Sequence, residues 1–251
     1  MVKPLAPDDE AVLDHVLRYR LTLPTILAKT GLLSEAGEDA ARTTLERLIR
    51  DGWLRTADLY PGHRSEPYYH LSEQGAEALQ QDVSVAQPLK AEARAEWYAI
   101  ATFCCCGESF RELLTKREFQ EKFSKLWFTG QPTRYYLDRG EDGVVRLAFL
   151  KVDTAGPGRW DRLIDSCAKF LRQRTDQTRV AAEHHPHVAE FARLVKRDQF
   201  QFTVLTALPE KQRAIELELD RRQRASEPVP PLRVHVVPGL FEVLFPAPST
   251  P

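Results

Sequence analysis

The 251-residue sequence has no long apolar run and almost no net charge. It contains no stretch of about 18 apolar residues, which excludes a membrane-spanning helix. Lys and Arg number 35 against 36 Asp and Glu, so a uniformly basic nucleic-acid binder is excluded, although a local basic face is compatible with this balance. The first ten residues are acidic and lack an apolar core, so we expect no secretory signal there. A composition with 43% hydrophobic and 28% charged residues indicates a soluble globular protein of one large domain or two small ones.

Cysteine is scarce, and its placement is uninformative for chemistry. Three of the four cysteines are the adjacent Cys104, Cys105 and Cys106, and the fourth is Cys167. Adjacent cysteines cannot all form disulfides with acceptable geometry, and they lack the Cys-x-x-Cys spacing of a zinc site. We therefore expect thiols that pack as small apolar groups in a reducing, cytoplasmic environment, with no bound metal and no cofactor.

Charge and hydrophobic periodicity divide the chain near residue 85. Residues 1–90 contain 10 basic and 14 acidic residues, a balance of −4, and the remainder therefore has a balance of +3. The stretch 81–88 interrupts two helical patterns and ends in a proline, as linkers often do. The sequence thus predicts a first domain over 1–85, a second over 88–246 and a disordered proline-rich tail over 247–251.

The first domain has the pattern of three helices, a two-stranded ribbon and a further helix. The predicted elements are helices over about 8–17, 25–30 and 38–51, strands over 53–56 and 68–71, and a helix that opens at Ser72. Residues 45–55, LERLIRDGWLR, and residues 68–75, YYHLSEQG, resemble the end of a recognition helix and the second wing strand of a winged helix-turn-helix domain.

This resemblance implies double-stranded DNA as the partner, because the recognition helix of such a domain enters the major groove and the wing lies along the backbone. With Ala41, Leu45 and Leu48 inward, polar and basic residues point outward, and arginine can bond a guanine edge or a phosphate at two points. The predicted DNA-binding residues are Arg42, Thr43, Arg47 and Arg50 on the helix and Arg55, His63 and Arg64 on the ribbon.

A second interpretation of the same helix is a solvated face without DNA. Glu38, Asp39, Glu46 and Asp51 share it, and Arg50 could pair with Glu46 one turn away. The balance of −4 also opposes long-range attraction to DNA. A winged helix used for protein binding, as an adaptor, therefore stays an alternative. A homodimer would double the basic face.

The second domain alternates helices and strands, which predicts a mixed sheet and an α+β protein overall. The predicted elements are two helices within 91–128, strands over 133–137 and 144–152 joined by a turn at 138–143, a helix to about 174, a strand over 200–205, a helix over 209–222 and a strand over 232–237.

This order resembles the core of restriction-endonuclease-like nucleases, in which an Asp on one strand and a Glu-x-Lys on the next bind Mg²⁺ and assist the attacking water. Asp138 matches the first carboxylate, whereas Lys151 replaces the second one and Asp153 stands where the lysine belongs. An ammonium group weakens a Mg²⁺ site, so we expect no catalysis. A Mg²⁺-dependent nuclease that uses Asp138 and Asp153, with Lys151, remains the alternative.

A winged helix followed by a hairpin, a Gly-containing turn and a long helix is also similar to the replication-relaxation family of bacterial plasmid and phage proteins. Residues 149–154, FLKVDT, and 160–171 carry the likeness, and the family usually has an acidic residue at the position of Lys151. The resemblance implies a DNA-binding protein of the transcription-regulator or replication type, with an inactive nuclease-like second domain.

Two further polar clusters have simpler explanations. His184, His185 and His187 surround a proline near two glutamates, which is compatible with zinc but more typical of an exposed loop before a helix. The basic run 221–224 could contact phosphate, although its place at the negative end of a helix explains it as well.

Overall fold

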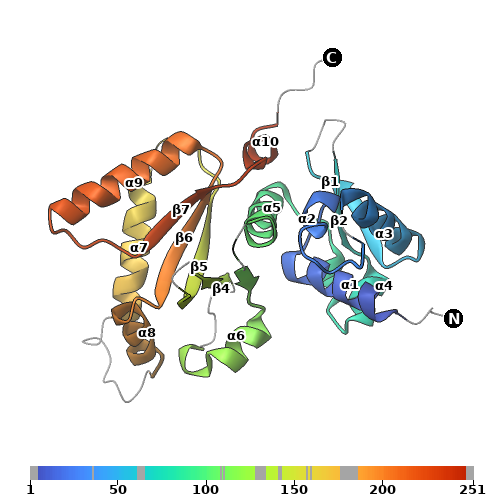
Figure 1. Ribbon diagram of the computed structural model, residues 1–251, viewed down its shortest axis with the longest axis horizontal. Helices are drawn as coiled ribbons and strands as arrows, with labels where there is room; N and C mark the ends of the chain where they lie inside the picture. Colours follow the sequence, from blue (N-terminus) through green and yellow to red (C-terminus); the bar gives the residue numbers. More distant parts are fainter. Residues whose placement is uncertain are drawn as a thin grey trace. The chain divides into compact units, whose positions relative to one another are not determined.

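The chain divides into two compact units, which are described separately (Figure 1). The first unit comprises residues 1–107 and 238–251, and the second comprises residues 108–237. The computed structural model describes residues 5–35, 37–60, 66–107, 109, 111–127, 134–140, 143–156, 158, 160–175 and 186–246. Both units contain helices and strands, so the predicted α+β class is confirmed. Within these ranges, no helix is long and apolar enough to cross a membrane.

The first unit contains the predicted order of helices and strands. Its elements are α1 (Pro7–Tyr19), α2 (Pro24–Leu27), α3 (Glu38–Arg50), β1 (Leu54–Asp58), β2 (Pro67–Leu71), α4 (Glu73–Ala78), the 3₁₀ helix η1 (Val83–Ala86), α5 (Ala91–Cys105) and α10 (Leu240–Leu244). One core joins the apolar sides of α1, α2 and α3 to β1 and β2; it includes Leu13, Leu27, Leu45, Leu48 and Trp53. Burial of the helices and the ribbon in a single core fixes the orientation of α3 within the unit.

The ribbon gains a third backbone segment between α1 and α2. β1 and β2 pair antiparallel, with Leu54 opposite Leu71, and Thr22 forms an isolated antiparallel bridge to Tyr69. The amide of each bridge residue donates to the carbonyl of the other, at 2.9 Å. The segment after α1 is thereby attached to β2, which ties the first helix to the ribbon.

A tight junction connects the end of α3 to the start of α4. The Ser72 hydroxyl donates to the Gly52 carbonyl at 2.6 Å and accepts a hydrogen bond from the Gly75 amide at 3.0 Å, so it caps α4. The Ser72 amide donates to the Trp53 carbonyl at 3.0 Å. A Cβ on Gly75 would lie 2.3 Å from that carbonyl oxygen, closer than any real contact. Glycine is therefore required where the two segments cross.

Helices α5 and α10 belong to the first unit, whereas the sequence suggested a boundary between residues 85 and 88. α5 packs against α1, α2 and α10. The Tyr98 hydroxyl of α5 donates to the Pro238 carbonyl at 3.0 Å, and Gly239 next to it has φ +74°. This contact joins positions 140 residues apart, so hydrophobic periodicity, which is a local signal, could not predict it. The predicted tail over 247–251 lies outside the described residues.

The second unit contains a five-stranded mixed sheet. Its elements are β3 (Arg111–Leu113), α6 (Lys116–Lys122), the 3₁₀ helix η2 (Ser124–Leu126), β4 (Tyr135–Arg139), β5 (Val145–Asp153), α7 (Trp160–Thr175), α8 (Pro186–Lys196), β6 (Phe200–Thr206), α9 (Pro209–Arg224) and β7 (Leu232–Val236). The strand order is β3-β4-β5-β6-β7. β4 runs antiparallel to both of its neighbours, β3 and β5, whereas β5, β6 and β7 run parallel to each other.

One face of this sheet is covered by α7, α8 and α9 (Figure 1). Phe149 and Phe202 of the sheet pack with Phe170 of α7, and Ile215 of α9 packs with Val204. The alternate residues of each strand therefore form the opposite face of the sheet.

The prediction of two helices over residues 91–128 is wrong at its second helix. Residues 111–113 form the edge strand β3, and the helix that follows is only seven residues long. Thr115 and Glu118 form a capping box that starts this helix after the strand. The apolar positions Leu113 and Leu114, which have helical spacing with Phe110, are buried residues at the end of a strand instead.

We expect Gly75→Ala to lower the free energy of unfolding of the first unit by about 2 kcal/mol, because the added methyl group meets the Trp53 carbonyl. Gly156→Ala is the matched control, since its Cβ would meet nothing within 4 Å. Urea denaturation measures both variants. Equal stability of Gly75→Ala and the parent protein would contradict the proposed crossing.

We expect the first unit to lose stability on mild acidification through His15. This side chain is buried and hydrogen-bonded to the Thr22 hydroxyl at 3.0 Å, and burial, with a smaller contribution from Arg18, lowers its pKa to about 4. The neutral form stabilises the fold fully above pH 6.5, and about 3 kcal/mol is lost as the pH falls from 6.5 to 4. His15→Gln should flatten this part of the pH profile in chemical denaturation; an unchanged slope would contradict it.

Candidate nucleic-acid interface

Helix α3 presents a mixed, mostly polar side away from the core. Ala41, Leu45 and Leu48 are buried, so residues half a turn away point outward. Thr43 and Arg50 are exposed on this outward side, and the acidic Glu46 lies between them. On this outward side of α3, the positive charge is therefore at the C-terminal end of the helix, on Arg50.

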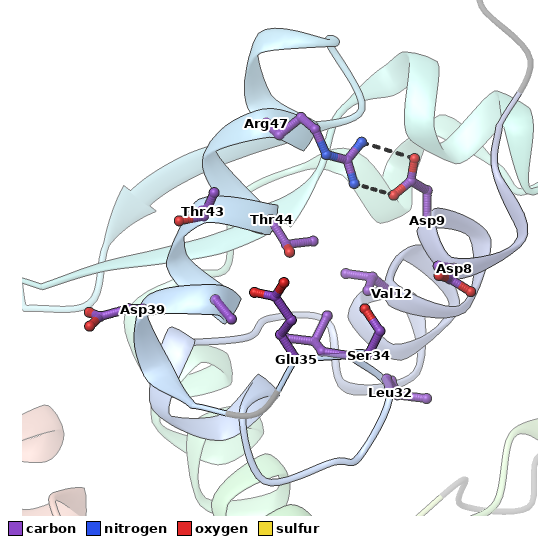
Figure 2. A pocket seen from close by; sticks show the side chains of 12 residues that line it. Asp8, Asp9, Val12, Leu32, Ser34, Glu35, Asp39, Thr43, Thr44 and Arg47 are labelled. Atoms are coloured by element: carbon purple, nitrogen blue, oxygen red, sulfur yellow. Dashed lines mark hydrogen bonds and ion pairs between the residues drawn. The ribbon is translucent and has the colours of Figure 1, made fainter.

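Arg47, one of the predicted DNA-binding residues, forms ion pairs with other residues of the protein. Its guanidinium group forms a two-pronged ion pair with the Asp9 carboxylate of α1, shown by the dashed lines in Figure 2. Asp51, one turn further along α3, lies 3.6 Å from the same group. These two carboxylates raise the pKa of Arg47 and neutralise its charge. Arg47 thus links α3 to α1, and its donors are occupied by carboxylates.

The side of α3 next to α1 is acidic. A cavity of about 490 Å³ there is lined by Asp8, Asp9, Glu35 and Asp39, with Arg47 at one side (Figure 2). Even with Asp9 paired to Arg47, acidic side chains outnumber cations in this lining, and they repel the phosphates of a DNA backbone. Any DNA contact of α3 would therefore involve the C-terminal end of the helix, away from this cavity.

Three of the predicted arginines have guanidinium groups that are exposed enough to contact a ligand. Arg42 pairs with Glu38 at 2.9 Å, but both side chains are nearly half exposed, and such surface pairs are weak. Arg50 and Arg55 are exposed, and in the described structure no ion pair joins Arg50 to Glu46. Arg55 of β1 also lines a groove of about 570 Å³ with Ile49 at the end of α3.

The remaining ribbon residues of the prediction, His63 and Arg64, lie outside the described residues.

The structure separates the two carboxylates of the predicted nuclease alternative. In the strand register, Asp138 of β4 lies opposite Arg146 of β5. Asp153 lies seven residues beyond Arg146 on β5. At about 3.3 Å per residue this is a distance of roughly 23 Å. Asp138 and Asp153 therefore cannot bind one Mg²⁺ ion, and the shared-metal hypothesis is wrong. Among the described residues, no group of three or more His, Cys, Asp or Glu is placed to hold a metal ion.

Asp153 and Lys151 have structural partners. The Asp153 carboxylate forms an ion pair of 2.5 Å with Lys211 of α9, and both side chains are almost fully buried. Lys211 also donates to the Gly156 carbonyl at 3.1 Å. Lys151 contacts the Ser166 hydroxyl of α7 at 2.5 Å. These bonds attach the end of β5 to its covering helices.

The basic run near the end of α9 is largely paired as well. Arg221 bonds Glu218 and Glu227, and Arg222 bonds Glu218 and Asp165. Of the histidine cluster, His184 and His185 lie outside the described residues, while His187 is in the first turn of α8.

Sequence reasoning missed the partners of two singled-out residues. Asp9 lies 38 positions from Arg47, and only Asp51 was visible at helical spacing. Around Asp138, the side chains of Arg111, Gln201 and Arg233 converge from three other strands. Strand order determines this convergence, and the sequence does not state strand order.

Comparison of the chain with protein-family models, with curated proteins and with solved structures finds no match.

We expect Asp153→Asn to destabilise the second unit by about 3 kcal/mol, because it leaves the ammonium group of Lys211 buried without its carboxylate. The double variant Asp153→Asn with Lys211→Met should recover most of this loss, since it removes the buried charge as well. Urea denaturation of both variants is the measurement. A single variant as stable as the parent protein would show that the pair is not structural.

Proposed function

We propose that the first unit binds double-stranded DNA as a winged helix-turn-helix domain, with α3 as the recognition helix and the β1–β2 ribbon as the wing. The element order supports this assignment, together with the Thr22–Tyr69 bridge that adds a third segment to the ribbon. The single observation that carries it is the pair of exposed arginines, Arg50 at the end of α3 and Arg55 at the start of the ribbon.

These two arginines come from neighbouring parts of the chain but from different elements. Arg50 is in the last turn of α3, and the end of that helix and the start of β1 are joined by the Gly52–Trp53 turn, which Ser72 holds by hydrogen bonds. A recognition helix and a wing strand connected in this rigid way can contact one groove and its flanking phosphates together. Arg42 and Thr43 lie in the N-terminal half of α3, and Thr43 also lines the acidic cavity, so these two residues would contribute less to the contact.

The acidic side of α3 limits the orientation of the DNA. Asp8, Asp9 and Asp39 lie around the cavity beside α1, so the duplex would approach the C-terminal half of α3 and the ribbon. A second copy of the chain would supply a second pair of arginines, and we propose a homodimer for this reason. The second unit, an endonuclease-like sheet without a shared metal pair, would serve in assembly or in non-specific DNA contact, as in a regulator or replication protein.

We expect the chain to bind a fluorescent duplex of mixed sequence in anisotropy titrations at about 50 mM salt, and to bind it more weakly as salt increases. Arg50→Ala and Arg55→Ala should each weaken binding about tenfold, because each removes one contact worth about 1.4 kcal/mol.

Lys90→Ala is the matched control for this titration. It removes one exposed positive charge from the first unit outside α3 and the ribbon, and it should change the affinity little. Absence of binding to any duplex at low salt would remove the proposal. If Lys90→Ala and Arg50→Ala weakened DNA binding equally, the binding would be a non-specific charge effect and α3 would not be the contact site.

A further inference from the structure

A polar cavity lies on the second unit's sheet, on the face opposite to α7 and α9. Asp138, Gln201 and Arg233 alternate along their strands with core residues such as Leu137, Phe202 and Val234, and so point to this opposite face. The cavity has a volume of about 460 Å³. This volume is within the range of small-molecule sites.

Four strands contribute to this constellation. The Gln201 side-chain amide on β6 donates to Asp138 Oδ2 on β4 at 2.8 Å. Arg111 Nε on β3 lies 3.9 Å from Asp138 Oδ1, and Arg233 Nη1 on β7 lies 3.9 Å from Oδ2. Asp138 therefore lies between two guanidinium groups and reduces their mutual repulsion.

The contact between Arg233 and Asp138 leaves donors available. A separation of 3.9 Å is too long for a hydrogen bond, and the Arg233 side chain is 53% exposed. A guanidinium group has five N–H donors in a planar fork, which matches two oxygens of a phosphate. Arg139, at the end of β4, also lines the cavity and is exposed.

Among the described residues that line the cavity, arginines outnumber carboxylates. Arg111, Arg139 and Arg233 line it together with one described carboxylate, that of Asp138. His235 lines it as well; burial, and next the charge of Arg111, lower the pKa of His235, so the ring is mainly neutral at pH 7 and adds little to the charge of the cavity. This surplus of arginines attracts an anionic ligand group, and a doubly charged one most strongly.

We propose that this cavity binds a phosphate monoester, with the exposed Arg233 and Arg139 contacting its oxygens. A monoester carries between about 1.5 and 2 negative charges at pH 7, whereas a phosphodiester of a nucleic-acid backbone carries one. The charge balance thus favours a terminal phosphate, which a small metabolite, a nucleotide or the 5′ end of a nucleic acid can supply. The proposal does not depend on DNA binding by α3.

Isothermal titration calorimetry of the full chain tests it, in chloride buffer at constant ionic strength, with inorganic phosphate and adenosine 5′-monophosphate as probes. We expect saturable binding at one site. Arg233→Gln should weaken it about tenfold or more, because one charge-assisted contact is lost. This variant changes a half-exposed side chain, and its circular dichroism spectrum should match that of the parent protein.

The matched control is Arg224→Gln, which removes an exposed positive charge from the same unit outside the cavity and should leave phosphate binding unchanged. Two oligonucleotides distinguish the sources of the phosphate: a short duplex with 5′-phosphates should compete with adenosine 5′-monophosphate, and the same duplex without them should not. Absence of saturable binding by both small probes, equal affinities in Arg233→Gln and the parent protein, or competition by the unphosphorylated duplex alone would overturn the proposal.

Discussion

The register between β4 and β5 determines where the acidic side chains of the second unit lie and which cations they meet. The short turn between these strands places Asp138 beside Arg146, at the hairpin end, and Asp153 lies at the far end of β5, beyond its pairing with β4. Two carboxylates that a metal-dependent nuclease would bring together are thereby kept apart. Each then meets cations: Asp153 meets the buried Lys211, and Asp138 meets Arg111 and Arg233. The first arrangement stabilises the fold, whereas the second leaves arginine donors facing a cavity.

In the first unit, the same distinction between engaged and available arginines decides which residues can contact a ligand. Arg47 and Arg50 lie three positions apart on one helix and look equivalent in the sequence. Arg47 reaches Asp9 of α1 and Asp51, whereas Arg50 is exposed. A guanidinium group already bonded at two points to a carboxylate would have to lose that bond before contacting DNA. The proposed interface is therefore placed at the C-terminal end of α3 and the ribbon, not at Arg47.

Local pattern was sufficient for most elements but not for their assembly. The apolar spacing of Ala41, Leu45 and Leu48 predicts α3, and Ser72 with Gly75 predicts the start of α4, because capping and burial act over a few residues. The edge strand β3 was missed, since three residues cannot establish a period. The attachment of α10 to α5 through Tyr98, and the convergence of side chains on Asp138, depend on contacts between distant positions. No local signal encodes those contacts.

The charge of the chain is distributed unevenly between its two units, which bears on both proposals. The first unit, residues 1–107 and 238–251, has 11 basic and 17 acidic residues, a balance of −6. It therefore cannot attract DNA from a distance, and its affinity would rest on short-range contacts by few arginines. Such an interface releases few counterions and depends on salt less steeply than that of a strongly basic protein. The second unit, residues 108–237, has 24 basic and 19 acidic residues, a balance of +5, and three of its arginines line one cavity. Its positive charge is thus partly concentrated at a single point, as suits recognition of one compact anion more than an extended backbone.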